Sequence, residues 1–201
     1  MTWVKVCGLT TRRDVAVAIE AGADALGFVA VPASPRFIEL DRVAELAAGI
    51  PAMTVLLTVD VPADEMPTLL ATAGVSAVQP YGRDREAAAR AALAAGYAVL
   101  FPVRAVAGVD LSQIPGTPLL DTPAADRLGG TGRSFDWSLA EGIRRDFVLA
   151  GGLGPDNVER AIRQVQPWGV DASSGLEQSS GRKDHGMVTD FISKAKRRET
   201  R

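Results

Sequence analysis

Short apolar segments rich in β-branched residues alternate with longer, alanine-rich segments along the whole chain. Each apolar segment has the length of a buried strand, and most of the segments between them leave room for one helix. The predicted strands cover residues 3–7, 23–29, 53–58, 76–79, 97–103, 118–121, 146–151 and 168–172. The predicted helices cover residues 11–21, 40–48, 63–73, 83–95 and 155–166, the last with Pro155 in its first turn and Asp156 at its positive end.

Regular alternation of strands and helices is typical of a parallel sheet, and runs such as VLLTV and FVLAG are apolar enough for strands buried on both faces. The alternative is an open doubly wound sheet, which usually has fewer strands at this length and a G-x-G-x-x-G turn after the first strand. No such turn follows residues 3–7. Strands recurring about every 25 residues therefore predict an α/β fold, a closed (β/α)8 TIM barrel.

The weakest unit is the fifth, because residues 104–117 show little helical periodicity and contain two glycines and a proline. We expect a reduced fifth helix there, either a loop or a single helical turn. No low-complexity linker divides the chain, so residues 1–201 are predicted to form a single domain.

Composition narrows the class of protein. Hydrophobic residues make up 47% of the chain and charged residues 23%, with a net charge of −2. These values are typical of a globular protein and give no general attraction for nucleic acid or for an acidic membrane. No signal peptide and no apolar segment of membrane-spanning length is present, so we expect a cytoplasmic protein.

A single cysteine and a single histidine limit the possible chemistry. Cys7 has no partner for a disulfide within the chain, and His185 alone excludes a histidine-rich metal site. His185 is expected in an exposed loop before the last helix and is assigned no role. We therefore expect no metal site.

In a (β/α)8 barrel the active site lies at the carboxyl ends of the strands. Polar and glycine residues follow the predicted strands at several of these ends. The candidate site residues are Cys7, Arg36, Asp121, Gly151, Gly152, Asp171, Ser173, Ser174 and Gly175. If the barrel is closed, these residues converge on one mouth.

The glycine-rich turns after the seventh and eighth predicted strands are candidates for a phosphate site. Glycine allows the backbone to approach an anion closely, and N–H groups at the start of a helix point toward it. Ser173, Ser174 and Gly175 are expected to begin a short extra helix of this kind. The alternative is that the glycines only form tight turns.

Cys7 is interpreted as a candidate reactive thiolate, and the alternative is an inert core cysteine. A reactive thiolate needs a lowered pKa, which a nearby positive group supplies. Lys5 has the same side-chain parity as Cys7, so both are expected to face the barrel interior. Barrel closure places Asp171 beside Lys5, and a buried lysine needs such a partner, so a Lys5–Asp171 contact is predicted.

Asp121 and Arg36 complete the candidate chemistry. Asp121 ends an apolar strand, where partial burial would raise the pKa of its carboxyl group and suit it to act as a general acid. The planar guanidinium of Arg36 suits bidentate binding of a substrate carboxylate. The alternatives are a turn or cap role for Asp121 and a solvated loop position for Arg36.

Taken together, KVCGLT, SPRFI, LLD, GGTGRSFDW, LAGGLGPDNV, VDASSGLE and GRKD resemble the phosphoribosylanthranilate isomerase family of tryptophan biosynthesis, in order and spacing. The resemblance implies an Amadori rearrangement of an aminoaldose phosphate to 1-(2-carboxyphenylamino)-1-deoxyribulose 5-phosphate. It implies Asp121 as general acid and Cys7 as general base. It also implies that Arg36 holds the anthranilate carboxylate and that the glycine turns hold the phosphate. No cofactor is expected, since the iminium form of the substrate is its own electron sink.

The chain differs from the family pattern at Leu57, Thr58, Pro80, Tyr81 and Ser180. We expect these differences in the walls of the anthranilate pocket. The partner is expected to be a small phosphorylated substrate, with no nucleic acid and no membrane, and the chain to be a monomer or homodimer.

Two other functions remain open. One is the related barrel sugar-phosphate isomerase of histidine biosynthesis, although such enzymes usually pair two aspartates where this chain offers Cys7 and Asp121. The other is a non-catalytic phosphate-binding barrel, because this fold hosts many functions.

Overall fold

The computed structural model describes residues 1–106, 108–121 and 136–197. Eight parallel strands pair in sequence order, and β1 also pairs with β8, which closes the barrel. The strands are β1 Trp3–Cys7, β2 Ala25–Val29, β3 Met53–Val59, β4 Ala77–Tyr81, β5 Ala98–Arg104, β6 Thr117–Asp121, β7 Val148–Leu149 and β8 Gly169–Ala172. The closed barrel confirms the predicted fold and excludes the open sheet.

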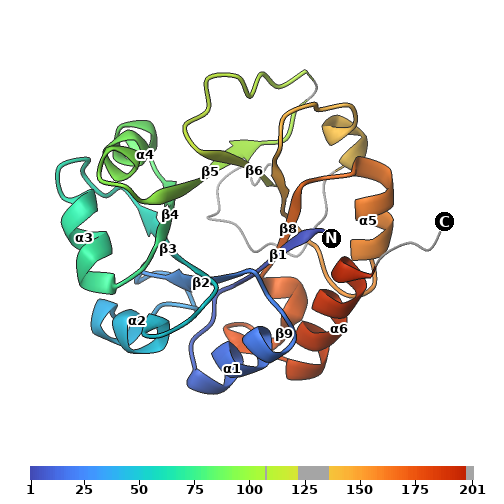
Figure 1. The fold of residues 1–201 in the computed structure, drawn as a ribbon, viewed down its shortest axis with the longest axis horizontal. Helices are drawn as coiled ribbons and strands as arrows, with labels where there is room; N and C mark the ends of the chain where they lie inside the picture. The colour runs from blue at the N-terminus through green and yellow to red at the C-terminus, as the bar shows by residue number, and fades with distance from the viewer. Residues whose placement is uncertain (107, 122–135, 198–201) are drawn as a thin grey trace.

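Helices surround the strands, as Figure 1 shows. They are α1 Arg12–Glu20, α2 Leu40–Ala47, α3 Met66–Ala73, α4 Arg85–Ala94, α5 Val158–Val165 and α6 His185–Lys196, with two 3-10 helices, η1 Trp137–Ala140 and η2 Ser174–Leu176. The described residues between β5 and β6 contain no helix, as predicted for the fifth unit. In Figure 1 this segment is the yellow-green loop at the top of the view, outside the strands β5 and β6.

The predicted start of the helix at residues 155–166 is wrong. α5 begins at Val158, so Pro155 and Asp156 lie in the turn before it. The side chain of Asn157 holds that turn, because its Oδ1 accepts a hydrogen bond from the N–H of Gly154 and its Nδ2 donates one to the carbonyl of Gly152. A side chain that bonds to local backbone competes with the helix and delays its start.

The prediction that His185 lies in an exposed loop is also wrong. His185 is the first residue of α6, and its side chain is 32% exposed. Its Nε2 lies 2.8 Å from Oδ1 of Asp14, whose other oxygen closes a capping box with Thr11 at the start of α1. Hydrogen bonds from His185 and Thr11 hold the pKa of Asp14 below its ordinary value, although burial opposes this. The pair connects the helices on either side of β1.

The hydrophobic core has two parts because side chains alternate across each strand. One part packs the barrel against its helices and includes Leu26, Leu56 and Leu120. The other fills the barrel interior with Ala25, Val55, Ala77, Leu100, Leu119, Val148 and Ala150. These apolar side chains fill the lower barrel, below the carboxyl ends of the strands.

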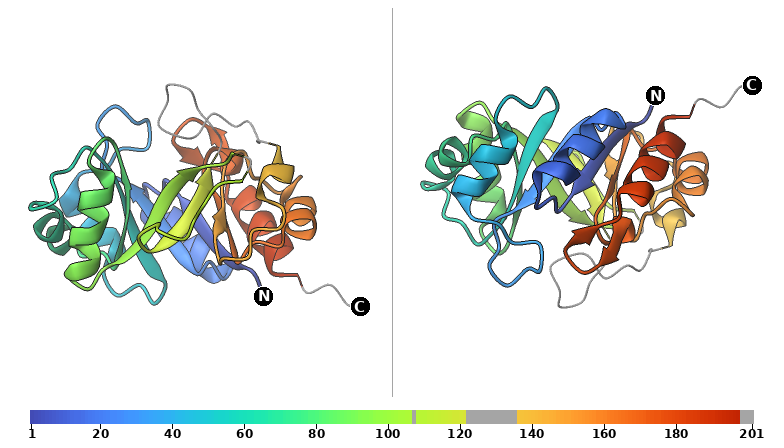
Figure 2. Two further views of the ribbon diagram at one scale, coloured as in Figure 1. Left: turned by 90° about the horizontal axis from the view of Figure 1, so that it is seen from above. Right: turned by 90° about the horizontal axis from the view of Figure 1, so that it is seen from below.

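The two ends of the barrel differ. Trp3 stacks on Trp168 with ring centroids 5.0 Å apart at the end where the strands begin. The loop after β2 and the hairpin formed by β9 Glu177–Ser179 and β10 Arg182–Lys183 lie at the other end, away from the N-terminus (Figure 2). No helix of the described residues is long and apolar enough to cross a membrane.

Candidate active site

A cavity of about 540 Å³ opens at the carboxyl ends of the strands. This volume is in the range that holds a small organic ligand. All nine residues predicted from the sequence line it: Cys7, Arg36, Asp121, Gly151, Gly152, Asp171, Ser173, Ser174 and Gly175. Barrel closure brings them together from segments that are far apart in the chain.

Beneath the cavity, Lys5 is fully buried inside the barrel. Its Nζ lies 3.0 Å from Oδ1 of Asp171 on the neighbouring strand and donates a hydrogen bond to Oε1 of Gln79 at 3.0 Å. The predicted Lys5–Asp171 contact is therefore confirmed. Burial disfavours the ammonium, but Asp171 and Cys7 raise the pKa of Lys5 above its ordinary value, so the lysine is charged.

Cys7 lies on the same strand face as Lys5, with only 4% of its surface exposed. Burial raises the pKa of its thiol above the ordinary value, and the lowering effects of Lys5 and Lys183 do not overcome this. The lowered pKa that a reactive thiolate needs is therefore not present here, because taking a thiolate out of water costs more than two neighbouring cations recover. A thiolate formed here is correspondingly a strong base.

Gln79 links Lys5 to Tyr81 in the wall of the cavity. Its Nε2 donates a hydrogen bond to the Tyr81 hydroxyl at 2.9 Å, while its Oε1 faces Lys5. Burial and the nearby charge of Asp121 raise the pKa of Tyr81 well above its ordinary value. Asp121 ends β6 and is partly exposed at the cavity, so a carboxyl group and a thiol line one space from different strands.

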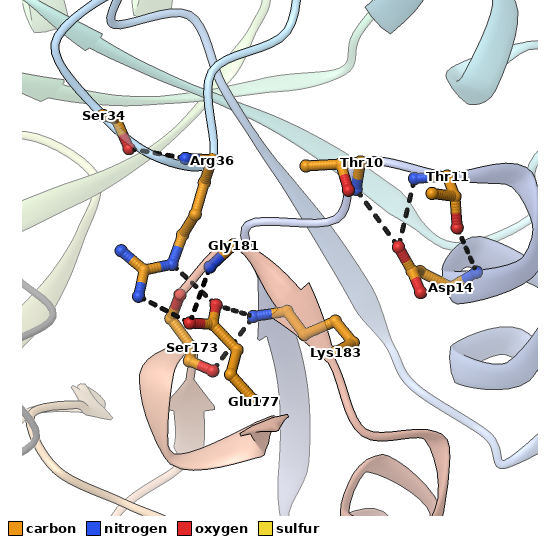
Figure 3. Close-up of polar contacts among 9 residues, drawn as sticks. All are labelled: Thr10, Thr11, Asp14, Ser34, Arg36, Ser173, Glu177, Gly181 and Lys183. Atoms are coloured by element: carbon orange, nitrogen blue, oxygen red, sulfur yellow. Dashed lines mark hydrogen bonds and ion pairs between the residues drawn. The ribbon is translucent and has the colours of Figure 1, made fainter. Parts of the chain in front are cut away.

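Arg36 is held by a buried ion-pair cluster, shown in Figure 3. Its Nε and Nη2 donate to Oε1 and Oε2 of Glu177 at 2.7 and 2.8 Å. Lys183 Nζ donates to Glu177 Oε1 at 2.8 Å and to the carbonyl of Ser173 at 2.9 Å. Although burial opposes it, these hydrogen bonds from Arg36 and Lys183 hold the pKa of Glu177 below its ordinary value.

Gly8 shows why the turn after β1 has no side chain. A Cβ at this position would lie 2.5 Å from Cδ of Arg36 and 3.1 Å from Oγ of Ser173. The backbone has φ +76°, which also favours glycine. Gly8 therefore lets Arg36 cross directly over the end of β1, beside Cys7.

The glycine loops after β7 and β8 pack backbone against backbone. A Cβ on Gly175 would lie 2.0 Å from the carbonyl oxygen of Leu153, and one on Gly154 would lie 3.0 Å from the carbonyl oxygen of Gly175. Both glycine-rich loops line the cavity. Backbone N–H groups at the rim of a cavity suit an anion such as phosphate. η2 is the short extra helix that the sequence predicted.

Some of the residues that differ from the family pattern face the cavity and others face away from it. Leu57, Tyr81 and Ser180 line the cavity, as expected. Thr58 and Pro80 are buried but do not line it, so the expectation is wrong for these two. Each is next to a residue that faces inward, and neighbouring side chains on a strand point to opposite faces.

The sequence reasoning assigned no role to Glu177, Lys183 or Gln79. Glu177 lies in VDASSGLE and Lys183 in GRKD. The pattern that could have indicated their ion pair is a glutamate six residues before a lysine in a predicted polar turn. Gln79 was visible only as a polar residue in an otherwise apolar strand. Most of the motif GGTGRSFDW lies outside the described residues, which include only its final Asp136 and Trp137.

No group of three or more His, Cys, Asp or Glu residues within the described ranges is placed to hold a metal ion. A closed barrel with a thiol, a carboxyl group, an arginine and paired glycine loops at its mouth defines the class. This class is the TIM-barrel enzymes that bind a small phosphorylated molecule at the strand ends.

Comparison with known proteins gives the family. Residues 4–194 match the family described as N-(5'phosphoribosyl)anthranilate (PRA) isomerase. The N-(5'-phosphoribosyl)anthranilate isomerase of Magnetococcus marinus is 40% identical over 200 residues, covering 96% of this chain and 95% of the relative. This chain belongs to the phosphoribosylanthranilate isomerase family.

Solved structures agree. The phosphoribosyl anthranilate isomerase of Thermotoga maritima superposes with a TM-score of 0.87 at 35% identity, covering 98% of this chain and 99% of the other. A similar structure, with a TM-score of 0.83 at 33% identity and the same coverage, is a complex of such an isomerase with reduced 1-(o-carboxyphenylamino)-1-deoxyribulose 5-phosphate.

Proposed function

We propose that this protein isomerises N-(5'-phosphoribosyl)anthranilate to 1-(2-carboxyphenylamino)-1-deoxyribulose 5-phosphate in tryptophan biosynthesis. The observation that carries the proposal is the convergence of Cys7 and Asp121 on one cavity that Arg36 and the two glycine loops also line. Membership of the isomerase family supports the same reaction. Neither alternative, the histidine-pathway isomerase or the non-catalytic barrel, is favoured by a particular contact.

The reaction starts with ring opening. In the proposed mechanism the protonated Asp121 carboxyl group gives its proton to the furanose ring oxygen, and the bond from this oxygen to C1′ breaks. The anthranilate nitrogen lone pair then forms the C=N bond of an iminium ion. Cys7 removes the C2′ proton as a thiolate, and the released electron pair forms the enolamine and neutralises the nitrogen. Tautomerisation places a proton on C1′ and leaves the ketone at C2′.

The electrostatics of the site fit this order of steps. The thiol pKa is raised in the free protein, chiefly by burial. The iminium formed by ring opening adds a positive charge within the same cavity, and a nearby positive charge favours the thiolate. The thiolate is therefore easier to form at the stage that needs it.

The remaining site residues bind the substrate in this proposal. Backbone N–H groups of the loops at Gly151–Gly152 and Ser173–Gly175 receive the phosphate. Arg36 holds the anthranilate carboxylate. Asp171 lines the cavity and holds Lys5 beneath Cys7, so it supports both the substrate and the base.

The test is turnover of phosphoribosylanthranilate, followed by the loss of its anthranilate fluorescence. We expect robust activity for the wild type and a fall in kcat of about 10²–10⁴-fold for both Cys7→Ala and Asp121→Asn, with circular dichroism spectra unchanged. Asp190→Asn, on an exposed face of α6, is the matched control and should be fully active. Folded wild-type protein without turnover would overturn the proposal.

A location in the cytoplasm, a single domain and a monomeric or homodimeric state stay predictions from the sequence.

A further inference from the structure

Glu177 lies behind the cavity wall rather than in it. Its side chain is 4% exposed, and it does not line the cavity, whereas Arg36 does. Lys183, the other cation on Glu177, is fully buried and is also absent from the lining. Any action of Glu177 on a ligand therefore passes through its neighbours, and of the two cations that it binds only Arg36 lines the cavity.

The geometry of the pair fixes which face of Arg36 is left for a ligand. A guanidinium has five N–H groups arranged as two forks, one along Nε and Nη2 and one across Nη1 and Nη2. Glu177 occupies the first fork with both of its carboxylate oxygens. Nη1 and the second N–H of Nη2 remain, and Figure 3 shows Nη1 pointing away from Glu177.

The rest of the cluster keeps Glu177 itself from moving. Lys183 Nζ and the N–H of Gly181 bind its two oxygens at 2.8 and 3.2 Å. Lys183 is in turn bonded to the Ser173 carbonyl, at the start of the η2 loop. The loop after β2, the hairpin and the loop after β8 thus form one connected unit around Arg36.

Charge balance points to the kind of ligand. Arg36 and Lys183 share the carboxylate of Glu177 within this mostly buried cluster, although burial lowers the pKa of Lys183 below its ordinary value. An unbalanced buried charge is costly, so the unit favours an anion at the open fork. The flat fork matches the two oxygens of a carboxylate, and the proposed phosphate site lies at the loops after β7 and β8 instead.

We propose that Glu177 is a positioning residue that locks Arg36 with its end fork toward the cavity, and so makes recognition depend on an ortho-carboxylate on the substrate's aromatic ring. This rests on the proposed function. Preorganisation matters because an arginine held in its bound rotamer loses little conformational entropy when the ligand arrives.

The test compares two ligands by calorimetry. One is reduced 1-(o-carboxyphenylamino)-1-deoxyribulose 5-phosphate, and the other is the same compound without the carboxylate. The variant is Glu177→Gln, whose amide places an NH2 group against Arg36 or Lys183 and so breaks the double hydrogen bond. Glu86→Gln, in an exposed pair with Arg90, is the control.

We expect the wild type and Glu86→Gln to bind the carboxylated ligand at least about tenfold more tightly than the other. Glu177→Gln should reduce this ratio to about two- or threefold while the affinity for the ligand without carboxylate changes less than about twofold. An unchanged ratio in Glu177→Gln would overturn the inference. An equal loss for both ligands would also overturn it, since it would show a structural role alone.

A second measurement uses only the wild type and holds even if Glu177→Gln does not fold. The meta- and para-carboxylate isomers of the ligand should bind about as weakly as the ligand without carboxylate, because a locked fork cannot follow the displaced group. Equal binding of all three isomers would refute the locked geometry. Wild-type protein that binds none of the carboxylated ligands would instead contradict the proposed function itself.

Discussion

Lys5 is the residue whose environment most affects the proposed chemistry. It is a buried cation directly beneath Cys7, held by Asp171 and Gln79. Its positive charge lowers the pKa of the thiol, although burial keeps that pKa above the ordinary value. Because Cys7 is the only cysteine in the chain, thiol chemistry reports on this residue alone.

We predict that Lys5→Met shifts the midpoint of the pH–alkylation profile of Cys7 to higher pH. Only the thiolate reacts with iodoacetamide, and removing a nearby cation makes the thiolate harder to form. The variant should also lose about 3–5 kcal/mol of unfolding free energy, because Asp171 is left buried without its partner. The midpoint is measured from the rate of iodoacetamide modification between pH 6 and 11.

Leu26→Ala is the matched control for this experiment. Leu26 is fully buried but faces the helices rather than the barrel interior. It should lower the free energy of unfolding without changing the midpoint. A Lys5→Met profile that coincides with the wild type would show that the charge of Lys5 does not act on Cys7.

At the scale of elements, the paired loops after β7 and β8 form the proposed phosphate site. Their close contact depends on Gly175, whose position leaves no space for a Cβ beside the Leu153 carbonyl. Gly175 lies within η2, which leads directly into the β9–β10 hairpin that carries Glu177 and Lys183. One short segment therefore supplies both the anion cradle and the residues that hold Arg36.

We predict that Gly175→Ala weakens competitive inhibition by inorganic phosphate by about tenfold or more. The added methyl group must push the two loops apart, which misplaces the N–H groups that receive the phosphate. The inhibition constant is measured in the fluorescence assay.

Gly96→Ala provides the comparison, since a Cβ there meets nothing within 4 Å and the position lies after α4. Its φ of +90° makes alanine strained, so the variant should lose about 1 kcal/mol of stability yet bind phosphate normally. Normal phosphate inhibition in Gly175→Ala would place the anion elsewhere.

For the whole molecule, the barrel depends on two cores separated by one layer of strands. Leu119 and Leu120 are adjacent on β6, fully buried, and point into the inner and outer core respectively. Closure by β1 and β8 makes the inner core continuous around the barrel. We expect the two cores to unfold together.

Leu119→Ala and Leu120→Ala should each lower the free energy of unfolding by about 2–5 kcal/mol, because each leaves a cavity in a packed core. Urea unfolding followed by near- and far-ultraviolet circular dichroism should show coincident transitions in both variants. Separate transitions in either variant would mean that the two cores are independently stable.

The barrel strands, most of the helices and the type of fold could be predicted from the sequence alone. All eight strands of the barrel could be predicted from short apolar runs, since a strand buried on both faces needs apolar side chains throughout. The candidate residues at the strand ends also follow from the sequence, because parallel closure places every carboxyl end at one mouth. Even the Lys5–Asp171 contact could be predicted, from side-chain parity and closure.

Ion pairs between distant segments and the depth of burial could not be predicted from the local sequence pattern. Glu177 reaches Arg36 across 141 residues of sequence, and His185 reaches Asp14 across 171, so no local spacing predicts either pair. The raised pKa of Cys7 depends on how deeply the thiol is buried, which outweighs the cations beside it. Burial and long-range pairing are properties of the closed barrel, and they arise only once its segments have packed together.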